Sequence, residues 1–262
     1  MPRLDLCLVE RGLAESREKA QALIMAGRVR VNGLAATKAG AAVRADARVE
    51  VLAGPERVGR GALKLEGALG RFGLDPTGAV AVDVGASTGG FSQTLLQRGA
   101  ARVYCVDVGR AQLHEKLRDD PRVRVLEGLN ARHLSPREIP EPCGFATMDV
   151  SFISVLKILP ALRSVLGPEA VAVVLVKPQF EVGRADVGRG GIVRDPALHR
   201  RALESVARGA LALGYAVRGA CASPIEGATG NREFFLALEP GGDGTPPPEF
   251  DAMISAALEP VP

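Results

Sequence analysis

The sequence predicts an α/β protein with a large, mainly parallel sheet flanked by helices and a small α/β unit at its N-terminus. The length of 262 residues suggests one large domain or two unequal ones. From residue 62 onward, short apolar segments alternate with helical segments, which is typical of a doubly wound sheet. Residues 1–60 contain 11 Lys and Arg against 7 Asp and Glu, whereas the remaining residues contain 22 against 23. The excess positive charge therefore lies in the first quarter of the chain.

The composition is that of a soluble globular protein, with 47% hydrophobic and 24% charged residues. The longest apolar run, residues 170–176, is far shorter than the about 20 residues of a membrane-spanning helix. No basic stub followed by an apolar run marks a secretory signal at the N-terminus. The four cysteines lie far apart and the three histidines show no metal-ligand spacing, so we expect no metal site. These features predict a cytoplasmic protein.

The first fifty residues predict two short helices followed by a hairpin. Residues 3–12 and 17–26 have helical apolar spacing, and each segment is closed by a glycine. Residues 28–33 alternate charged and apolar side chains and end in Asn-Gly, a strong hairpin signal, and residues 49–52 form a returning strand. This arrangement gathers basic side chains that suit a polyanionic partner: Arg3, Arg11, Arg17, Lys19, Arg28 and Arg30.

The rest of the chain divides into a linker, a large domain and a tail. Residues 54–61 are rich in Gly, Pro and Arg and form the predicted linker. Strands are expected at residues 80–84, 103–108, 123–126, 145–148, 171–176 and 234–238. Glycines and prolines after residue 240 predict a flexible tail with a short helix at residues 249–258. The expected domains are therefore residues 1–60, 61–240 and 241–262.

A glycine-rich turn, residues 85–90, follows the first strand of the large domain. Its spacing is G-x-x-x-G-G, not the G-x-G-x-x-G of dinucleotide sites, and no Gly-Lys-Ser/Thr follows it. Asp107 lies 24 residues after Asp83, where a carboxylate can accept hydrogen bonds from ribose hydroxyls. A ribose acceptor without a pyrophosphate cradle favours S-adenosylmethionine over NAD, although such a turn alone leaves other ligands open.

Four charged residues form a candidate catalytic set: Lys64, Asp149, Lys177 and Glu233. Asp149 and Lys177 follow apolar strands and Glu233 precedes one, so all three can meet at the edge of the sheet. Methyl transfer to a hydroxyl needs an aligned oxygen and help with the loss of its proton. Two lysines interleaved with two carboxylates can supply that help. The alternative is that the four are unrelated surface charges.

Two resemblances to known families add to this interpretation. Residues 3–5, 16–20 and 27–33 resemble the S-four-type RNA-binding domain, which implies that the basic residues contact structured RNA. Residues 83–91 are similar to the S-adenosylmethionine motif of FtsJ-like RNA 2′-O-methyltransferases, which implies a Rossmann-like seven-stranded sheet whose last strand is antiparallel. The cofactor-binding residues that this implies are Asp83, Gly85, Ala86, Ser87, Thr88, Gly89, Gly90, Phe91, Asp107, Val108, Asn130 and Asp149.

The chain as a whole resembles the TlyA, or hemolysin A-like, family of rRNA 2′-O-methyltransferases. The matching segments are residues 149–154, 177–181, 223–225 and 230–233. The resemblance implies methylation of a ribose, of cytidine, in ribosomal RNA or ribosomal subunits. It also implies that Lys177 is the base or hydroxyl-orienting residue, that Asp149 and Glu233 hold the lysines, and that Lys64 completes the site.

Other roles and functions remain open at this stage. Phe152 and Phe180 are candidates for stacking on bases, with core packing as the alternative. The basic, Gly-rich residues 184–194 either close over RNA phosphates or form a plain loop. The chain as a whole could also be a non-catalytic RNA-binding assembly factor or a membrane-active hemolysin. The oligomeric state is not indicated.

Overall fold

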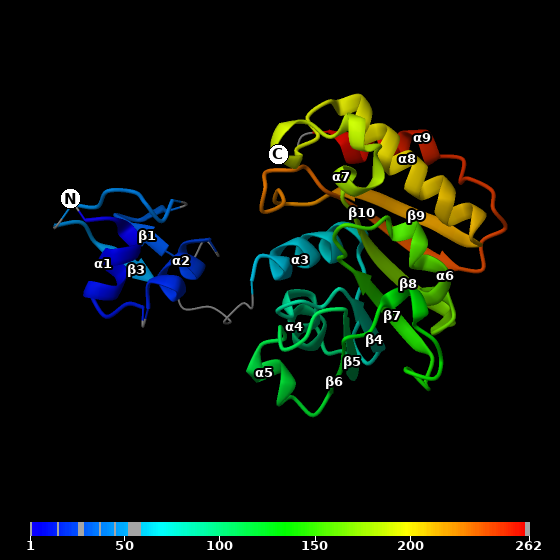
Figure 1. Ribbon diagram of the computed structural model, residues 1–262, viewed down its shortest axis with the longest axis horizontal. Helices are drawn as coiled ribbons and strands as arrows, with labels where there is room; N and C mark the ends of the chain where they lie inside the picture. The colour runs from blue at the N-terminus through cyan, green and yellow to red at the C-terminus, as the bar shows by residue number, and fades with distance from the viewer. Residues whose placement is uncertain are drawn as a thin grey trace. The chain divides into compact units, whose positions relative to one another are not determined.

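The computed structural model describes residues 2–14, 16–25, 29–36, 38–44, 46–51 and 59–259. The chain forms two compact units, Met1–Arg60 and Gly61–Pro262 (Figure 1). Each unit has a hydrophobic core and a β-sheet of its own.

The N-terminal unit packs two helices on a small antiparallel sheet. Helices α1 (Leu4–Glu10) and α2 (Arg17–Met25) precede strands β1 (Val29–Val31), β2 (Leu34–Ala35) and β3 (Val49–Val51), in the order β2-β1-β3. The largest side chains of its core come from both helices and the central strand: Leu4, Leu8, Ile24 and Val29.

The predicted hairpin is confirmed. Val31 pairs with Leu34, and the two residues between them, Asn32 and Gly33, have φ of 52° and 82°. Two successive positive φ values define the tight turn that matches the twist of antiparallel strands, which explains the Asn-Gly signal. Arg28, one of the predicted RNA-binding residues, lies outside the described residues.

The large unit is built on a seven-stranded sheet in the order β6-β5-β4-β7-β8-β10-β9. Its strands are β4 (Val80–Val84), β5 (Arg102–Asp107), β6 (Val123–Glu127), β7 (Cys143–Met148), β8 (Leu166–Val176), β9 (Tyr215–Ala222) and β10 (Phe234–Pro240). β4 to β8 run parallel, and β10 is antiparallel to both β8 and β9. The Rossmann-like seven-stranded fold is therefore confirmed. β9 was missing from the predicted strands because Arg218 and Gly219 interrupt its apolar pattern.

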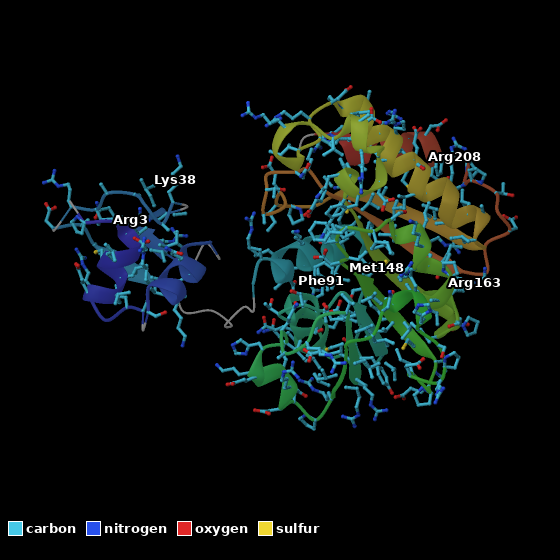
Figure 2. All side chains as sticks on the ribbon, in the orientation of Figure 1. Arg3, Lys38, Phe91, Met148, Arg163 and Arg208 are labelled. Carbon is cyan, nitrogen blue, oxygen red and sulfur yellow. The ribbon has the colours of Figure 1, made fainter. Side chains whose placement is uncertain are left out.

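Helices cover both faces of this sheet (Figure 1). Along β4, Val82 and Val84 join the core formed with α6, α8 and α9, whereas Asp83 meets Ser92 of α4 on the other face, as strand alternation requires. Met148, labelled near the centre of the large unit in Figure 2, belongs to the same core as Val82 and Val84. The helices are α3 (Gly61–Phe72), α4 (Gly90–Gln97), α5 (Glu115–Arg118), α6 (Leu159–Arg163), α7 (Pro178–Glu181), α8 (Pro196–Ala212) and α9 (Phe250–Leu258). Single 3₁₀ turns are η1 (Ala131–His133), η2 (Val155–Lys157), η3 (Arg184–Asp186) and η4 (Arg189–Gly191).

The C-terminal segment differs from the flexible tail that the sequence predicted. The short helix exists as α9, but Phe250 and Ile254 are buried in the large core. A Cβ atom on Gly242 would lie 2.5 Å from the backbone nitrogen of Ala216, so this part of the segment lies directly against β9. Because the apolar face of α9 is buried on the sheet, residues 241–259 belong to the large unit. Among the described residues, no helix is both long and apolar enough to cross a membrane.

Candidate active site

Three of the four predicted catalytic residues meet at one edge of the sheet. β7 and β8 are parallel neighbours, so Asp149 and Lys177, which follow them, emerge on the same side. β10 runs in the opposite direction, and its first residue, Phe234, pairs with Val176 at the end of β8. Glu233 and Lys177 are therefore the next residues at this edge, opposite each other across the two strands. Ligands of open α/β sheets bind beyond this edge.

Lys177 and Asp149 form an ion pair at the mouth of the site. Lys177 Nζ lies 2.5 Å from Asp149 Oδ1 and donates a hydrogen bond to Ser151 Oγ at 3.0 Å. The side chains of Lys177 and Asp149 are 11% and 22% exposed. The amine is thus held in place by two partners while part of the pair remains accessible to a substrate.

Lys64 and Glu233 form a second, more deeply buried pair. Lys64 lies in the first turn of α3, and its Nζ donates a hydrogen bond of 2.6 Å to Glu233 Oε2. Their side chains are 9% and 3% exposed. Gly227 lies close to this carboxylate, since a Cβ atom there would come 2.5 Å from Glu233 Oε1. The pair connects α3 to the start of β10, although its two residues are 169 positions apart in the sequence.

Because Phe234 pairs with Val176, Glu233 and Lys177 are neighbours across β10 and β8, which brings the two pairs to the same edge of the sheet. The four residues are here called the tetrad: Lys64, Asp149, Lys177 and Glu233. Each amine is neutralised by a carboxylate, which lowers the cost of removing both charges from water. The Lys177–Asp149 pair is the more exposed of the two. In the structure the four residues thus form two largely buried ion pairs, not four separate surface charges.

The glycine-rich turn lies beside the tetrad. Gly85 has φ of 83°, and a Cβ atom there would lie 2.9 Å from the carbonyl carbon of Asp149 and closer still to its oxygen. The Asp149 N–H donates a hydrogen bond to Val84 O at 2.9 Å. Backbone contact between the turn and Asp149 thus fixes the tetrad relative to the turn. The side of the turn that faces a small cavity of about 130 Å³ is formed by Gly85, Ala86, Ser87, Thr88, Gly90 and Phe91.

Asp107 sits at the end of β5 with a fixed carboxylate. Its Oδ2 accepts a hydrogen bond from Ser87 N at 2.8 Å, and its Oδ1 accepts one from Gly109 N at 2.7 Å. Each carboxylate oxygen retains acceptor capacity because it has a second lone pair. The geometry matches the position from which an acidic side chain binds two ribose hydroxyls.

A pocket of about 420 Å³ is lined by Gly85 and Ser87 of the turn, by Asp107 and by Asp149. Val108 and Leu129 give it apolar walls, and Asn130 lies at its rim, where its side chain caps η1 by accepting from Arg132 N. Asp149 and the ring of Phe152 lie at the other end. Apolar walls with a few fixed polar groups are typical of a cofactor site.

Two residues predicted to bind a cofactor, Asp83 and Gly89, line neither this pocket nor the small cavity beside the turn. Asp83 is fully buried, and its carboxylate accepts hydrogen bonds from Ser92 Oγ at 2.6 Å and Thr147 Oγ1 at 2.8 Å. Burial raises the pKa of Asp83 to about 6. Gly89 faces away from the pocket, because a Cβ there would collide with Leu113 and Leu117. Asp83 connects β4 to α4 through its hydrogen bond with Ser92, on either side of the turn. Gly89 is the N-cap residue of α4 and has the positive φ of 100°.

Three residues that help to build the site, Ser151, Glu181 and Asn231, are absent from the predicted site residues. Ser151 accepts a hydrogen bond from Lys177, and Glu181 Oε1 accepts one from Val155 N at 2.9 Å, joining α7 to the segment after Asp149. Burial raises the pKa of Glu181. Asn231, 1% exposed, fastens residues 191–193 to the segment before Glu233. All three lie inside the segments that resemble the TlyA family, residues 149–154, 177–181 and 230–233. That resemblance was the one sequence signal that could have identified them.

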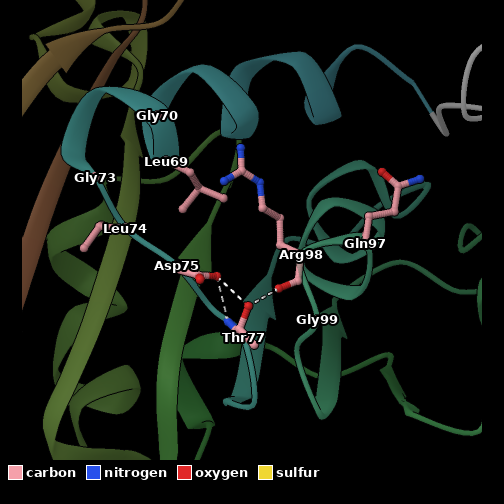
Figure 3. A pocket seen from close by; sticks show the side chains of 9 residues that line it. All are labelled: Leu69, Gly70, Gly73, Leu74, Asp75, Thr77, Gln97, Arg98 and Gly99. Carbon is pink, nitrogen blue, oxygen red and sulfur yellow. Dashed lines mark hydrogen bonds between the residues drawn. The ribbon is translucent and has the colours of Figure 1, made fainter.

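A separate surface depression of about 630 Å³ lies at the opposite edge of the sheet (Figure 3). Thr77 precedes β4 there, and its hydroxyl bonds Asp75 Oδ1 and Arg98 O. Gly99 precedes β5 in the same way. These residues lie where β4 and β5 begin, whereas the tetrad lies where the parallel strands end. The depression is therefore not part of the candidate active site.

In the N-terminal unit, a buried carboxylate organises two of the predicted RNA-binding residues. Asp5 is fully buried and accepts hydrogen bonds from Arg3, Arg17 and Gln21 at 2.9 to 3.0 Å. The guanidinium groups, chiefly that of Arg3, hold the pKa of Asp5 well below its usual range. Both arginine side chains remain about half exposed, at 48% and 50%. The guanidinium groups of Arg3 and Arg17 are thus fixed side by side by Asp5, and part of each remains exposed to solvent.

The other predicted RNA contacts have different local partners. Arg11 donates to Ala47 O at 2.7 Å, and Arg30 is exposed and donates to Gly33 O at 2.9 Å. Lys19 is also exposed. The described basic side chains therefore lie on both helices and the hairpin.

Comparison with known proteins assigns both units. The FtsJ-like methyltransferase family matches residues 57–240, and the S4 domain family matches residues 2–49. The chain is 50% identical over 238 residues to the 16S/23S rRNA (cytidine-2′-O)-methyltransferase TlyA of Mycobacterium tuberculosis, covering 90% of this chain and 89% of that protein. The chain belongs to the TlyA family of FtsJ-like methyltransferases.

Two further relatives support this TlyA-family assignment. Hemolysin A of Brachyspira hyodysenteriae is 40% identical over 236 residues, covering 88% of this chain and 97% of that protein. A solved structure of a protein from Streptococcus thermophilus that carries the name hemolysin has a TM-score of 0.74 at 41% identity, covering 98% of this chain and 95% of that one. The similarity of this TlyA-family chain to both relatives spans its two units.

S-adenosylmethionine is the cofactor of this TlyA-family enzyme. The pocket fits it: Asp107 would offer oxygen acceptors to the ribose, and Val108 and Leu129 would offer apolar surface to the adenine. The small cavity between the turn and Asp149, which Gly85 and Ser87 also line, would take the methionine portion. When bound, the cofactor supplies an electrophilic methyl group on a sulfonium.

Proposed function

We propose that this protein methylates the 2′-hydroxyl of a cytidine ribose in ribosomal RNA. One observation carries the proposal: two lysine–carboxylate pairs lie at the edge of the sheet where the strands end, and Asp149 of one pair lines the pocket that also holds Asp107 and part of the glycine turn. The similarity to a cytidine-2′-O-methyltransferase of 16S and 23S rRNA supports this choice of nucleotide and substrate. Action on ribosomal subunits corresponds to a cytoplasmic location.

In the proposed mechanism, Lys177 contacts the substrate hydroxyl. Its Nζ, fixed by Asp149 and Ser151, orients the ribose oxygen toward the methyl carbon or accepts the hydroxyl proton. The bound cofactor would supply the methyl carbon, which would bond to the ribose oxygen while its bond to sulfur breaks and the bonding electrons leave with sulfur. The hydroxyl proton would pass to Lys177 Nζ where this residue acts as the base, or to water where it only orients the oxygen. Lys64 and Glu233 act as positioning residues, because their pair holds α3 against β10 beneath the reacting atoms.

Cofactor contacts are divided among the turn, Asp107 and η1. Asp107 binds the ribose hydroxyls of the cofactor, and Val108 and Asn130 contact its adenine end. Residues 85–88 and 90–91 cradle the methionine portion, and Asp149 borders it. Asp83 and Gly89 act indirectly by shaping the turn.

The N-terminal unit supplies RNA affinity. The similarity to the S4 domain and the fixed, half-exposed guanidinium groups of Arg3 and Arg17 support contacts with RNA phosphates. Arg11, Lys19, Arg28 and Arg30 extend that surface along the sequence. We accordingly propose residues 1–60 as the RNA-binding domain and linker, and residues from 61 onward as the methyltransferase domain.

The test is a methylation assay with 30S and 50S ribosomal subunits and S-adenosylmethionine labelled on its methyl group. We expect label in 2′-O-methylcytidine after digestion of the RNA to nucleosides. Lys177→Ala should abolish incorporation, whereas Lys157→Ala, which alters an exposed lysine of η2, should not. RNA binding without incorporation would indicate an assembly factor. Leakage of protein-free lipid vesicles without incorporation would indicate a membrane-active protein. Either result would contradict the proposal.

A further inference from the structure

The segment between α7 and α8 carries three arginines with no role in the site described above. Arg184, Arg189 and Arg194 are all exposed. Within the described part of the chain, none of the three guanidinium groups has a hydrogen bond or ion pair with another residue. Unpaired guanidinium groups on a surface are suited to phosphate, which they bind in a bidentate manner.

The acidic residues of the same segment are already engaged. Asp186 pairs with Arg201 of α8, and Asp195 caps α8 by accepting from Ala197 N at 2.9 Å. Glu226, from the facing loop, lines a cavity of about 300 Å³ together with Arg194 and Arg232. The positive charge of the three arginines is therefore not neutralised within the segment.

The segment between α7 and α8 has a defined backbone conformation. It contains the turns η3 and η4, and Gly188 N donates to Ile192 O at 3.1 Å. Gly190 and Gly191 have φ of 78° and 76°, and a Cβ at either would meet only open space. The glycines therefore leave the backbone beside Arg189 open to close approach by a ligand.

Both ends of the segment are tied to the tetrad. Its N-terminal end continues from Lys177 through α7. Near its C-terminal end, Asn231 Oδ1 accepts from Val193 N at 2.9 Å, and Asn231 Nδ2 donates to Gly191 O at 2.8 Å. Asn231 precedes Glu233 by two residues, and Figure 1 shows the two loops side by side near α7. A nucleotide held at Lys177 would thus continue into RNA whose phosphates pass close to these arginines.

We propose that Arg184, Arg189 and Arg194, on a segment whose residues 191 and 193 are bonded to Asn231, form a second RNA-phosphate contact surface on the methyltransferase unit itself. This inference rests on the proposed RNA substrate and adds to it a surface separate from the N-terminal unit. The surface binds the sugar–phosphate backbone next to the target nucleotide and is independent of base identity. Its contribution is therefore electrostatic and sensitive to salt.

The experiment measures KM for the ribosomal subunits between 50 and 200 mM KCl with the full-length protein. In the double variant Arg189→Gln/Arg194→Gln, each lost phosphate contact should reduce the slope of log affinity against log salt by about 1. KM should rise, and the ratio of variant to wild-type KM should fall about tenfold across this salt range. The affinity for S-adenosylmethionine and the Tm should stay unchanged.

Two further variants control for charge and folding. Arg137→Gln/Lys157→Gln removes two other exposed cations and should keep the wild-type slope. Arg189→Lys/Arg194→Lys keeps the charge and should restore most of the slope. If the glutamine variant matches the Arg137→Gln/Lys157→Gln control, or if the lysine variant fails to restore the slope, the phosphate surface is refuted while the methyltransferase function stands. A wild-type protein that neither binds nor methylates RNA would instead refute the proposed function.

Discussion

Replacement of Gly85 by alanine tests whether the glycine turn and the tetrad are one structural unit. Gly85 adopts φ of 83°, and alanine in this left-handed region costs about 1–2 kcal/mol. The added Cβ would also lie 2.9 Å from the carbonyl carbon of Asp149 and closer to its oxygen. Ordinary contacts between such atoms exceed about 3.4 Å, so Asp149 must move by about 1 Å. A displacement of that size at reacting groups costs about 100-fold in rate.

Gly78 provides a matched control. Its φ of 74° imposes a similar backbone strain, but a Cβ there would meet nothing within 4 Å. Gly78→Ala should therefore lose about 1–2 kcal/mol of unfolding free energy and keep its activity. Gly85→Ala should lose at least as much stability and about 100-fold in kcat. Urea unfolding and single-turnover methylation measure the two effects. Equal turnover in the two variants would refute the backbone coupling between Gly85 and Asp149.

Three further predictions concern buried charge and the exposed aromatic ring. Lys64→Met leaves Glu233 buried without a partner and should cost about 3–5 kcal/mol in urea unfolding. The double variant Lys64→Met/Glu233→Met should recover most of that stability without recovering methylation; an active double variant would remove the pair from the mechanism. Burial raises the pKa of Asp83 to about 6, above its value in the unfolded chain, so this group's contribution to stability is largest below pH 4 and falls as pH rises to 6. Asp83→Asn should therefore gain up to about 3 kcal/mol relative to wild type between pH 4 and 7, and parallel stability curves would contradict this. Phe152 is 89% exposed with φ of 65°, so Phe152→Ala should leave Tm unchanged but raise KM for RNA about tenfold, as loss of one stacked base predicts; an unchanged KM would exclude stacking.

The exposure of Phe152 resolves an alternative that the sequence left open. Core packing was as reasonable as base stacking for an isolated aromatic residue, but the ring lies on the surface and contacts Phe180 at a centroid distance of 5.2 Å. Phe152 also lines the pocket beside Asp149. An exposed aromatic ring in a strained backbone conformation next to a candidate site favours a functional role.

Asp83 illustrates where sequence reasoning fails. Its position at the start of the glycine motif suggested a cofactor contact, but alternation along β4 turns its side chain toward Ser92 of α4. A strand pattern indicates which residues share a face, but not which face a ligand occupies. The same reasoning applies to Gly89, whose missing side chain makes room for Leu113 and Leu117 rather than for a ligand.

The sequence alone determined the fold class, the glycine turn, the hairpin and the types of residue in the site, because these depend on local periodicity and motif spacing. Only the tertiary structure decided how the charges combine. Lys64 meets Glu233, and Lys177 meets Asp149, because an antiparallel last strand returns to the edge where the parallel strands end. Partners separated by 169 positions leave no mark in any local pattern, since their contact is created by the packing of α3 against the sheet.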